Sequence, residues 1–398
     1  MELQEINISE AKPLLFEKST AGETVVVECS YIYNGASHSV DVHVTIQGDR
    51  STGKPFITFH DIGMNHVSNF SSLFNSEHME SIRNRFCVYH IDAPGMQENA
   101  PDLSKETGFA YPSIENLSDM VAKVFTKFSI KEAICIGCGL GANVLTRFAM
   151  KNPTLVDGLI AVNATRGAVG NLSWLGSKIT NWATPLHEQL LNYHFSKEEV
   201  ERANHELVEA HRKHLQNNMN ANNVQLLLKE YERRTEINVF RTVGPTTEEG
   251  EKHSIPCSTL LLVGDMSPFV EEVVELNSRL NPRKTTFLKM ADAGGMILEE
   301  QTFKVAEAIT YFLQGLGYIP SVIMSRLARS RTYSGCSTGS QDQDTKNRIR
   351  TLSGGSMGKD IAAGDTPLQK PIIEEVAAGD DIIAKTSDKA RLVTEGVC

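Results

Sequence analysis

The pattern of apolar and polar positions predicts a β-hairpin near the start of the chain. Apolar residues alternate with polar ones in TVVVECS and again in SVDVHVTIQ, within residues 24–48. Strict alternation of this kind is typical of half-buried strands. The two stretches are joined through NGAS, and an Asn-Gly pair between alternating runs favours a tight turn.

Beyond the hairpin, short apolar runs alternate with stretches of helical periodicity. The runs that read as strands are PFITF, RFCVYHID, EAICIG, VDGLIAV, CSTLLLVG and KTTFLKM. The segments with a period near 3.6 are residues 113–128, 141–151, 267–280 and 301–316, the first with Ser113 as its cap. Strands that alternate with helices predict a mostly parallel central sheet with helices on both faces.

The pattern becomes wholly helical between residues 165 and 254, which predicts a helical cap inserted into the sheet domain. In SKEEVERANHELVEAHRKHL, Ser196 and Glu199 have the spacing of a capping box, and NVQLLLKEYERRTEI continues in helical style. We expect residues 24–320 to form the domain and residues 1–23 a separate N-terminal segment. Residues 321–398 are rich in Ser, Thr, Gly, Asp and Lys, and we expect a disordered regulatory tail.

Composition narrows the function classes. The net charge of −10 argues against nucleic acid as a partner. The start of the chain has no signal-peptide pattern, and no apolar run reaches the length of a membrane span, so we expect a cytoplasmic protein without an integral membrane segment. The seven cysteines are scattered and have no zinc spacing, so we expect reduced thiols and no metal site.

The order of the predicted elements matches an α/β-hydrolase fold with a cap. In that fold the nucleophile stands at the centre of G-x-S-x-G, on a strained turn that needs small neighbours. The corresponding frame here is Gly137-Cys138-Gly139-Leu140-Gly141, which places Gly139 at the nucleophile position. Glycine has no side chain that could attack a substrate. The adjacent Cys138 is out of frame, and we interpret it as a buried small residue.

The other triad positions are degenerate as well. The acid position after the penultimate strand holds Ser267, with Asp265 two residues earlier, and an Asp at a strand end more often bonds loop amides. The base position holds Gly295, and the last histidine of the chain is His253. Without an imidazole, a serine or cysteine nucleophile is not deprotonated efficiently at neutral pH. We therefore predict no hydrolase activity.

The loop HDIG, with His60, Asp61 and Gly63, occupies the place from which backbone amides contribute to an oxyanion hole. We interpret His60 as a loop residue that bonds neighbouring backbone, rather than as a group that polarises a substrate. If the fold is as predicted, replacing Gly139 by Ser and Gly295 by His should place two triad members near each other.

A glycine-rich turn after a strand can also hold a cofactor. ICIGCGLGANVL resembles the first motif of methyltransferases that use S-adenosylmethionine, and it partly matches a dinucleotide fingerprint. Both motifs require acidic residues, but the expected positions hold Cys135 and Asn163. We therefore predict no cofactor.

Several long strings carry a family resemblance. They are HDIGMNH, HIDAPGMQENA, YPSIENLSDM, GCGLGA, VVELNSRLNP, TTFLKMADAGGM, YFLQGLGYIPS and SRLARSRTYSGCS. From about residue 24 to 340 the chain resembles the N-myc downstream-regulated gene family. The resemblance implies an α/β-hydrolase fold without the hydrolytic triad. It also implies a mainly cytoplasmic protein of signalling, stress response, growth and differentiation, with a phosphorylated C-terminus.

The tail repeats one motif, RSRTYSGCS and RIRTLSGGS. In each copy two arginines precede a serine in the R-x-R-x-x-S pattern that basophilic Ser/Thr kinases prefer, which makes Ser334 and Ser353 the first phosphorylation candidates. The further candidates are Thr332, Ser337 and Ser356. A phosphate adds about −1.5 to −2 charge at pH 7 and creates or breaks docking contacts.

These observations favour a non-catalytic signalling or adaptor protein whose partners are other proteins and basophilic kinases. The alternative is an enzyme with non-standard residues, such as Cys138 or Asp265, or a protein that binds a small molecule or lipid in the remnant pocket.

Overall fold

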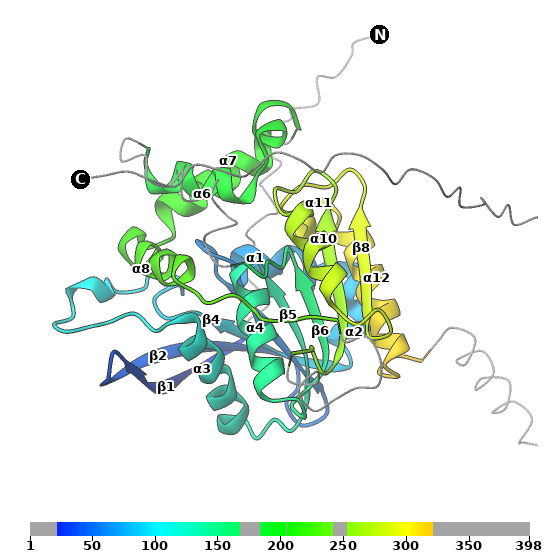
Figure 1. Ribbon diagram of the computed structural model, residues 1–398, viewed down its shortest axis with the longest axis horizontal. Coiled ribbons are helices and arrows are strands. Elements are labelled where there is room, and N and C mark those ends of the chain that lie inside the picture. The colour runs from blue at the N-terminus through cyan, green and yellow to red at the C-terminus, as the bar shows by residue number, and fades with distance from the viewer. Residues whose placement is uncertain (1–21, 168–183, 204, 242–252, 321–398) are drawn as a thin grey trace, which may run out of the picture. The chain divides into compact units, whose positions relative to one another are not determined.

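A mixed β-sheet organises the residues that the computed structural model describes, which are 22–167, 184–203, 205–241 and 253–320 (Figure 1). In this part of the chain the sheet has the strand order β1-β2-β4-β3-β5-β6-β7-β8. The β1-β2 and β2-β4 pairs are antiparallel and all other pairs are parallel. The strands are β1 (Glu23–Tyr33), β2 (Ala36–Gln47), β3 (Lys54–Phe59), β4 (Phe86–Asp92), β5 (Ala133–Cys138), β6 (Val156–Val162), β7 (Ser258–Gly264) and β8 (Thr285–Met290). The predicted, mostly parallel sheet is confirmed.

The hairpin of β1 and β2 forms as its alternation and its Asn-Gly pair predict. Asn34 and Gly35 have φ angles of 48° and 81°, the left-handed values that a type I′ turn requires at both central positions. Val27 pairs with Val42 and Cys29 with Val40 on the buried side of the pair. One face of the hairpin thus joins the core while the residues between remain exposed.

Helices cover both faces of the sheet. The helices are α1 (His66–Phe74), α2 (Glu80–Arg83), α3 (Ile114–Lys127), α4 (Leu140–Lys151), α6 (Leu186–His194), α7 (His205–Asn217), α8 (Ala221–Glu232), α10 (Val270–Arg279), α11 (Ile297–Glu300) and α12 (Thr302–Gly315). Within the described ranges, two turns of 3₁₀ type, η3 (Glu77–Met79) and η4 (Leu103–Lys105), and a π-helical turn, η5 (Glu199–Ala203), accompany these helices. Residues of α3, α4 and α10 share one buried cluster, and those of α1, α2, α11 and α12 share another. In β5, Cys135 enters the first cluster and Ile136 the second, as alternation along a strand requires.

Two helix starts illustrate what the pattern predicts and what it misses. Ser113 caps α3 by accepting a hydrogen bond from the Asn116 amide at 3.2 Å, as predicted. Helix α1 was not predicted, because its buried positions include the polar residues Ser68, Asn69 and Ser71 and hide the apolar period. Its start is fixed by a capping box between Asn65 and Ser68.

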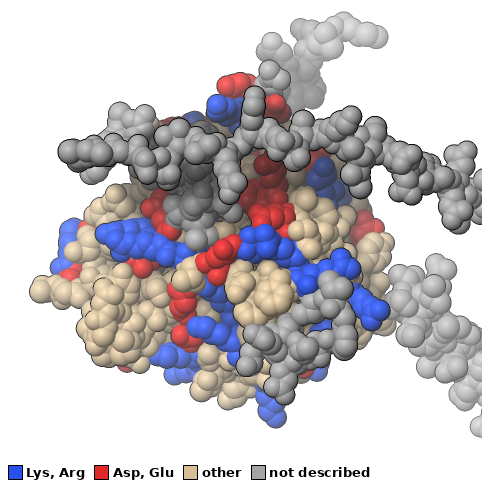
Figure 2. Space-filling model, in the orientation of Figure 1, with Lys and Arg blue, Asp and Glu red and all other residues tan. Residues whose placement is uncertain are grey.

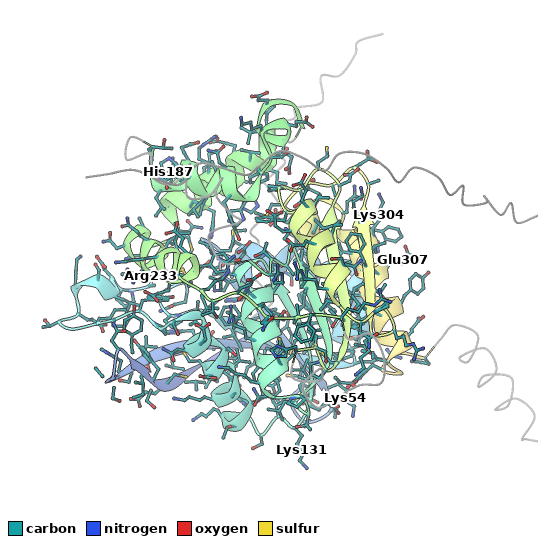
Figure 3. The ribbon with its side chains drawn as sticks, in the orientation of Figure 1. Lys54, Lys131, His187, Arg233, Lys304 and Glu307 are labelled. Atoms are coloured by element: carbon teal, nitrogen blue, oxygen red, sulfur yellow. The ribbon has the colours of Figure 1, made fainter. Side chains whose placement is uncertain are left out.

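The helices of the insertion lie over the carboxyl ends of the parallel strands (Figure 1). Figure 3 marks both ends of the sheet: Lys54 and Lys131 lie where β3 and β5 begin, while His187 and Arg233 belong to the insertion. Ser196 and Glu199 form the predicted capping box, with the Ser196 amide bonded to Glu199 Oε2 at 2.7 Å and the Glu199 amide to Ser196 Oγ at 3.3 Å. We call α6, η5, α7 and α8 the cap.

The boundaries predicted for the segments stay predictions. The tail, with all five phosphorylation candidates, and the N-terminal residues 1–21 lie outside the described residues, as do residues 168–183, 204 and 242–252 of the predicted insertion. Helix α8 ends at Glu232, before the end of the predicted helical stretch at Ile237.

The described residues on the face of the molecule in Figure 2 show no large area of one charge sign. On the face seen in Figure 2, Lys and Arg side chains are interspersed with Asp and Glu. Among the described residues, none of the helices combines the length and the hydropathy that a bilayer span requires.

Candidate functional site: a remnant hydrolase centre

The glycine-rich turn between β5 and α4 has the shape of a nucleophile turn. Gly139 lies between them with φ 46° and ψ −106°, a conformation that side chains rarely adopt. Its neighbours are small for packing reasons: a Cβ at Gly141 would overlap the backbone carbonyl of Phe59, and one at Gly137 would overlap Gly141. The strained, tightly packed bend is therefore present while the position at its apex has no side chain.

The carboxylate of Asp61 fills the space beside Gly139. A Cβ added at Gly139 would fall inside that carboxylate, far within van der Waals contact. Asp61 Oδ1 accepts hydrogen bonds from the backbone amides of Leu140 and Ile62, both at 2.8 Å. These are the residue after the nucleophile position and a residue of the loop after β3, which supply the oxyanion hole in an α/β-hydrolase. An aspartate side chain of the same chain thus occupies this pair of donors.

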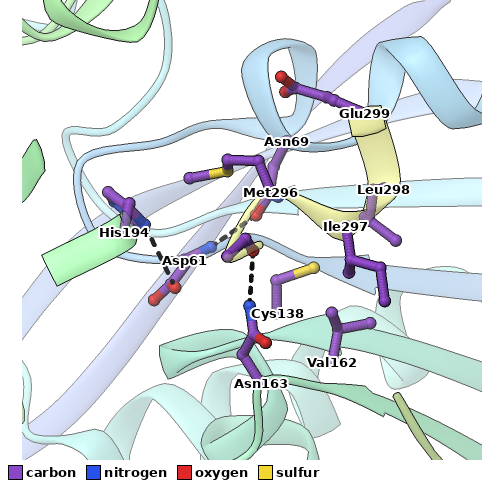
Figure 4. A pocket seen from close by; sticks show the side chains of 11 residues that line it. Asp61, Asn69, Cys138, Val162, Asn163, His194, Met296, Ile297, Leu298 and Glu299 are labelled. Atoms are coloured by element: carbon purple, nitrogen blue, oxygen red, sulfur yellow. Dashed lines mark hydrogen bonds and ion pairs between the residues drawn. The ribbon is translucent and has the colours of Figure 1, made fainter. Parts of the chain in front are cut away.

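The surroundings of Asp61 raise the pKa of its carboxyl group. The side chain is 4% exposed, and burial raises the pKa of Asp61 to about 6, although the bonds from Leu140, Ile62 and Tyr193 favour the charged form. Tyr193 Oη lies 3.2 Å from Oδ1. His194 Nδ1 lies 3.8 Å from Oδ2 (Figure 4). Helix α6 of the cap therefore meets the core at this carboxylate.

Backbone and side-chain atoms of the cap fill the base position. A Cβ at Gly295 would overlap the backbone oxygen of His194, and one at Gly294 would overlap Glu199 Oε1. The Gly295 amide donates to Glu199 Oε1 at 3.1 Å, and its carbonyl accepts from Asn163 Nδ2 at 2.7 Å. That Ser at 139 and His at 295 would lie near each other stays a prediction, and both replacements require local rearrangement because the volume beside each glycine is already taken.

The acid position belongs to a structural network. Ser267 Oγ donates to Asn163 Oδ1 at 3.2 Å and accepts from the Phe269 amide at 3.3 Å. Asp265 accepts from the Ala293 amide at 3.2 Å, which is the loop contact that its place at a strand end suggests. These bonds connect the loops that follow β6, β7 and β8.

The remaining residues of the loop after β3 are also committed to structure. His60 is fully buried, receives the Ala93 amide at Nε2 (2.9 Å) and therefore donates from Nδ1 to the Asp61 carbonyl (2.7 Å). Gly63 has φ 71°, and a Cβ there would lie 2.8 Å from a methyl carbon of Leu215 in the cap. The loop is shaped by its contacts with the cap and with β4.

Cys138 is a poor substitute nucleophile. Its side chain is 4% exposed and packs in the cluster formed with α1 and α12. Burial raises the pKa of the Cys138 thiol well above its usual range, and the nearby Asp61 charge adds to this. The reactive thiolate is therefore strongly disfavoured at neutral pH.

The pocket at this centre is almost filled by its own lining. It is lined by residues that include Asp61, Cys138, Asn163 and His194, and the space open to the centre of a water molecule is only about 10 Å³ (Figure 4). That space is sufficient for about one water molecule. The described residues also contain no group of three or more His, Cys, Asp or Glu side chains placed to hold a metal ion.

The sequence does not reveal which residues fill the site. It points to the loop after β3, but the roles of Tyr193, His194 and Glu199 depend on contacts between positions about 100 or more residues apart, for which no local pattern exists.

Comparison with known proteins places the chain in a family. Residues 36–320 match the sequence model of the Ndr family. The chain belongs to the Ndr family. The resemblance read from its motifs is thus confirmed.

Relatives within the Ndr family are similar over most of their length. Protein NDRG1 of Xenopus tropicalis is 42% identical over 348 residues, which cover 86% of this chain and 85% of the relative. Protein NDRG2 of Danio rerio is 39% identical over 364 residues, which cover 90% and 95%.

Solved structures of hydrolases share the fold of this Ndr-family chain. A thermophilic esterase from Thermogutta terrifontis aligns with a TM-score of 0.54 and 17% identity, over 73% of this chain and 99% of the esterase. An enol-lactonase from Burkholderia xenovorans LB400 aligns with a TM-score of 0.53 and 15% identity, over 72% and 99%. The α/β-hydrolase fold predicted from the sequence is confirmed, and at such identities the likeness concerns the fold alone.

Proposed function

We propose that this chain is a non-catalytic, cytoplasmic signalling or adaptor protein of growth, differentiation or stress response, regulated by phosphorylation of its C-terminal tail. The observation that carries the non-catalytic part is the Asp61 carboxylate, which lies beside Gly139 and takes both backbone donors of the oxyanion hole. The small free volume of the pocket beside Asp61 supports the same conclusion, since ligand sites usually have several hundred Å³. The regulatory part rests on the duplicated arginine-serine motif and on the family resemblance.

The alternative of an unconventional enzyme has weaker support. Cys138 is buried with a raised thiol pKa, and Asp265 is bonded to the Ala293 amide. Neither group is paired with an imidazole in the way that nucleophilic catalysis requires.

The catalytic question has a direct assay. We expect the purified full-length chain to hydrolyse short-chain p-nitrophenyl esters no faster than the Cys138→Ala and Asp265→Asn variants. We also expect that neither a fluorophosphonate probe nor iodoacetamide labels one specific site of the full-length chain. Turnover that disappears in either variant would refute the non-catalytic proposal, and an esterase of the same fold serves as the positive control.

Phosphorylation of the tail is tested by mapping sites on protein recovered from stimulated cells. We expect phosphate on Ser334 and Ser353, because each has arginines three and five residues before it. Replacing both by Ala should remove most labelling by a basophilic kinase in vitro. The matched control is Ser340→Ala, because Ser340 has no arginine three or five residues before it. This replacement should leave labelling unchanged. Labelling that survives the double replacement would contradict the assignment.

A further inference from the structure

Both backbone amides of the oxyanion hole are present, although glycines stand at the nucleophile and base positions beside it. The Ile62 and Leu140 amides converge on one oxygen atom at equal distances of 2.8 Å. Leu140 is the first residue of α4, whose amide has no partner within the helix, and both residues are fully buried. Two buried donors that point to one spot require an acceptor.

We infer that Asp61 is the built-in occupant of this hole: its carboxylate takes the place of a substrate oxygen and fastens helix α6 of the cap to the core. The inference rests on the proposed loss of catalysis, because a working hydrolase needs the hole empty for its substrate. It adds a function for the site, which is to hold the cap in the closed position.

The contacts on the cap side give the carboxylate this second function. Tyr193 Oη donates to Oδ1 at 3.2 Å, so one oxygen atom gathers donors from the loop after β3, from α4 and from α6. His194 Nε2 lies 2.8 Å from the Ile62 carbonyl and donates to it, because a carbonyl only accepts. Its Nδ1 therefore carries no proton in the neutral ring and faces Asp61 Oδ2 at 3.8 Å.

This arrangement also assigns the two oxygen atoms of Asp61 different tasks. Oδ1 keeps the three donors, while Oδ2 faces an acceptor and is the atom to which a proton would add. The other charged or titratable groups near the carboxylate are Arg234 at the end of the cap, which favours its ionised form, and the Cys138 thiol at the end of β5. Protonation near pH 6 would remove the negative charge that Oδ1 presents to its three donors and would let Oδ2 donate towards His194 Nδ1, without vacating the hole.

No other anion has room while Asp61 is in place. The side chain fills the volume beside Gly139, and the open space of about 10 Å³ is too small for a carboxylate. Removing the Asp61 carboxyl group should therefore create a site for a small free carboxylate, and formate is the smallest probe of that class.

The test compares the full-length chain with its Asp61→Ala and Asp61→Asn variants by thermal unfolding at pH 7.5. We expect 0.2 M sodium formate to raise the Tm of Asp61→Ala by about 3 °C relative to 0.2 M sodium chloride, in a saturable manner. Wild type and Asp61→Asn should not respond, because a side chain fills the hole in both. Neutral formamide should not replace formate. A formate response equal in wild type and Asp61→Ala would overturn the inference.

A measurement on the wild type keeps the inference testable if Asp61→Ala does not fold. We expect the amide ¹H shifts of Ile62 and Leu140, and those of α6, to titrate together with a midpoint near pH 6, the pKa of Asp61. Amide shifts of Ile62, Leu140 and α6 whose midpoints differ from that of the Asp61 carboxyl group would overturn it. Ester turnover by the wild type would instead refute the proposed function, so the two failures are distinguishable.

Discussion

Replacing Gly139 by Ser should destabilise the protein by about 2–6 kcal/mol and should not produce hydrolysis. Two costs add up. A side chain at φ 46° and ψ −106° is strained by about 1–3 kcal/mol, and its Cβ would overlap the Asp61 carboxylate, for which overpacking costs about 1–3 kcal/mol more. Hydrolysis should remain absent because the base position at Gly295 is filled by the His194 carbonyl. Urea unfolding and an ester assay measure the two expectations.

A double-mutant cycle separates the two costs. Gly108→Ser is the matched control, since Gly108 has φ 77° and nothing lies within 4 Å of an added Cβ. It should show the conformational cost alone, about 1 kcal/mol. Combining Gly139→Ser with Asp61→Ala should cost about 1–3 kcal/mol less than the sum of the two single changes, because the overlap is removed. Simple additivity would mean that the carboxylate does not occupy the space beside Gly139.

The turn at Gly139 was predictable because its cause is local. A strand that must bend sharply into a helix requires small residues at fixed spacing, and Gly137, Gly139 and Gly141 show that spacing directly. The hairpin followed for the same reason, since Asn34 and Gly35 tolerate the left-handed conformation that the turn imposes. Periodicity gave the alternation of strands and helices, and hence the parallel sheet.

The groups that lie beside Gly139 and Gly295 could not be predicted, because they come from residues distant in the sequence. Asp61 reaches the Leu140 amide across 79 positions, and Glu199 reaches the Gly295 amide across 96. Nothing local distinguishes Asp61 from an aspartate that hydrogen-bonds its own loop. The sequence itself shows that Gly139 and Gly295 carry no side chain, whereas the carboxylate and the cap carbonyl that lie beside them required the structure.

Buried neutral histidines should make the domain unstable in mild acid. Burial lowers the pKa of His90, His194 and His214 to about 3 in each case. The neighbouring His66 lowers the pKa of His90 further, and the neighbouring His211 lowers those of His194 and His214. The unfolded chain takes up a proton at each near pH 6.5, so below that pH it binds more protons than the folded chain. Stability contributed by these groups is complete above pH 6.5 and is lost as the pH falls toward 3.

Three buried or partly buried carboxyl groups, those of Asp61, Glu199 and Glu300, act in the opposite direction. The pKa of Asp61 is raised to about 6 and those of Glu199 and Glu300 are raised as well, mainly by burial. Their folded forms bind protons before the unfolded forms do, so their penalty at neutral pH is relieved as the pH falls. At pH 5 each histidine lowers the stability by about 2 kcal/mol, and Asp61 raises it by about 1 kcal/mol. The effect of the histidines is therefore the larger one. We expect the free energy of unfolding to fall by about 3–5 kcal/mol between pH 7.5 and pH 5.

Urea unfolding at the two pH values tests this balance. His194→Asn and His214→Asn should each remove about 2 kcal/mol of the difference between pH 7.5 and pH 5, whatever they do to the stability at pH 7.5. The same substitution at His78, on the surface, is the control for the change of side chain itself. His194 and His214 both belong to the cap. If amide hydrogens of the cap lose their protection against hydrogen exchange before those of the sheet, the cap is the first part to open in acid. An unchanged pH dependence in both variants would show that these imidazoles are not what limits stability in acid.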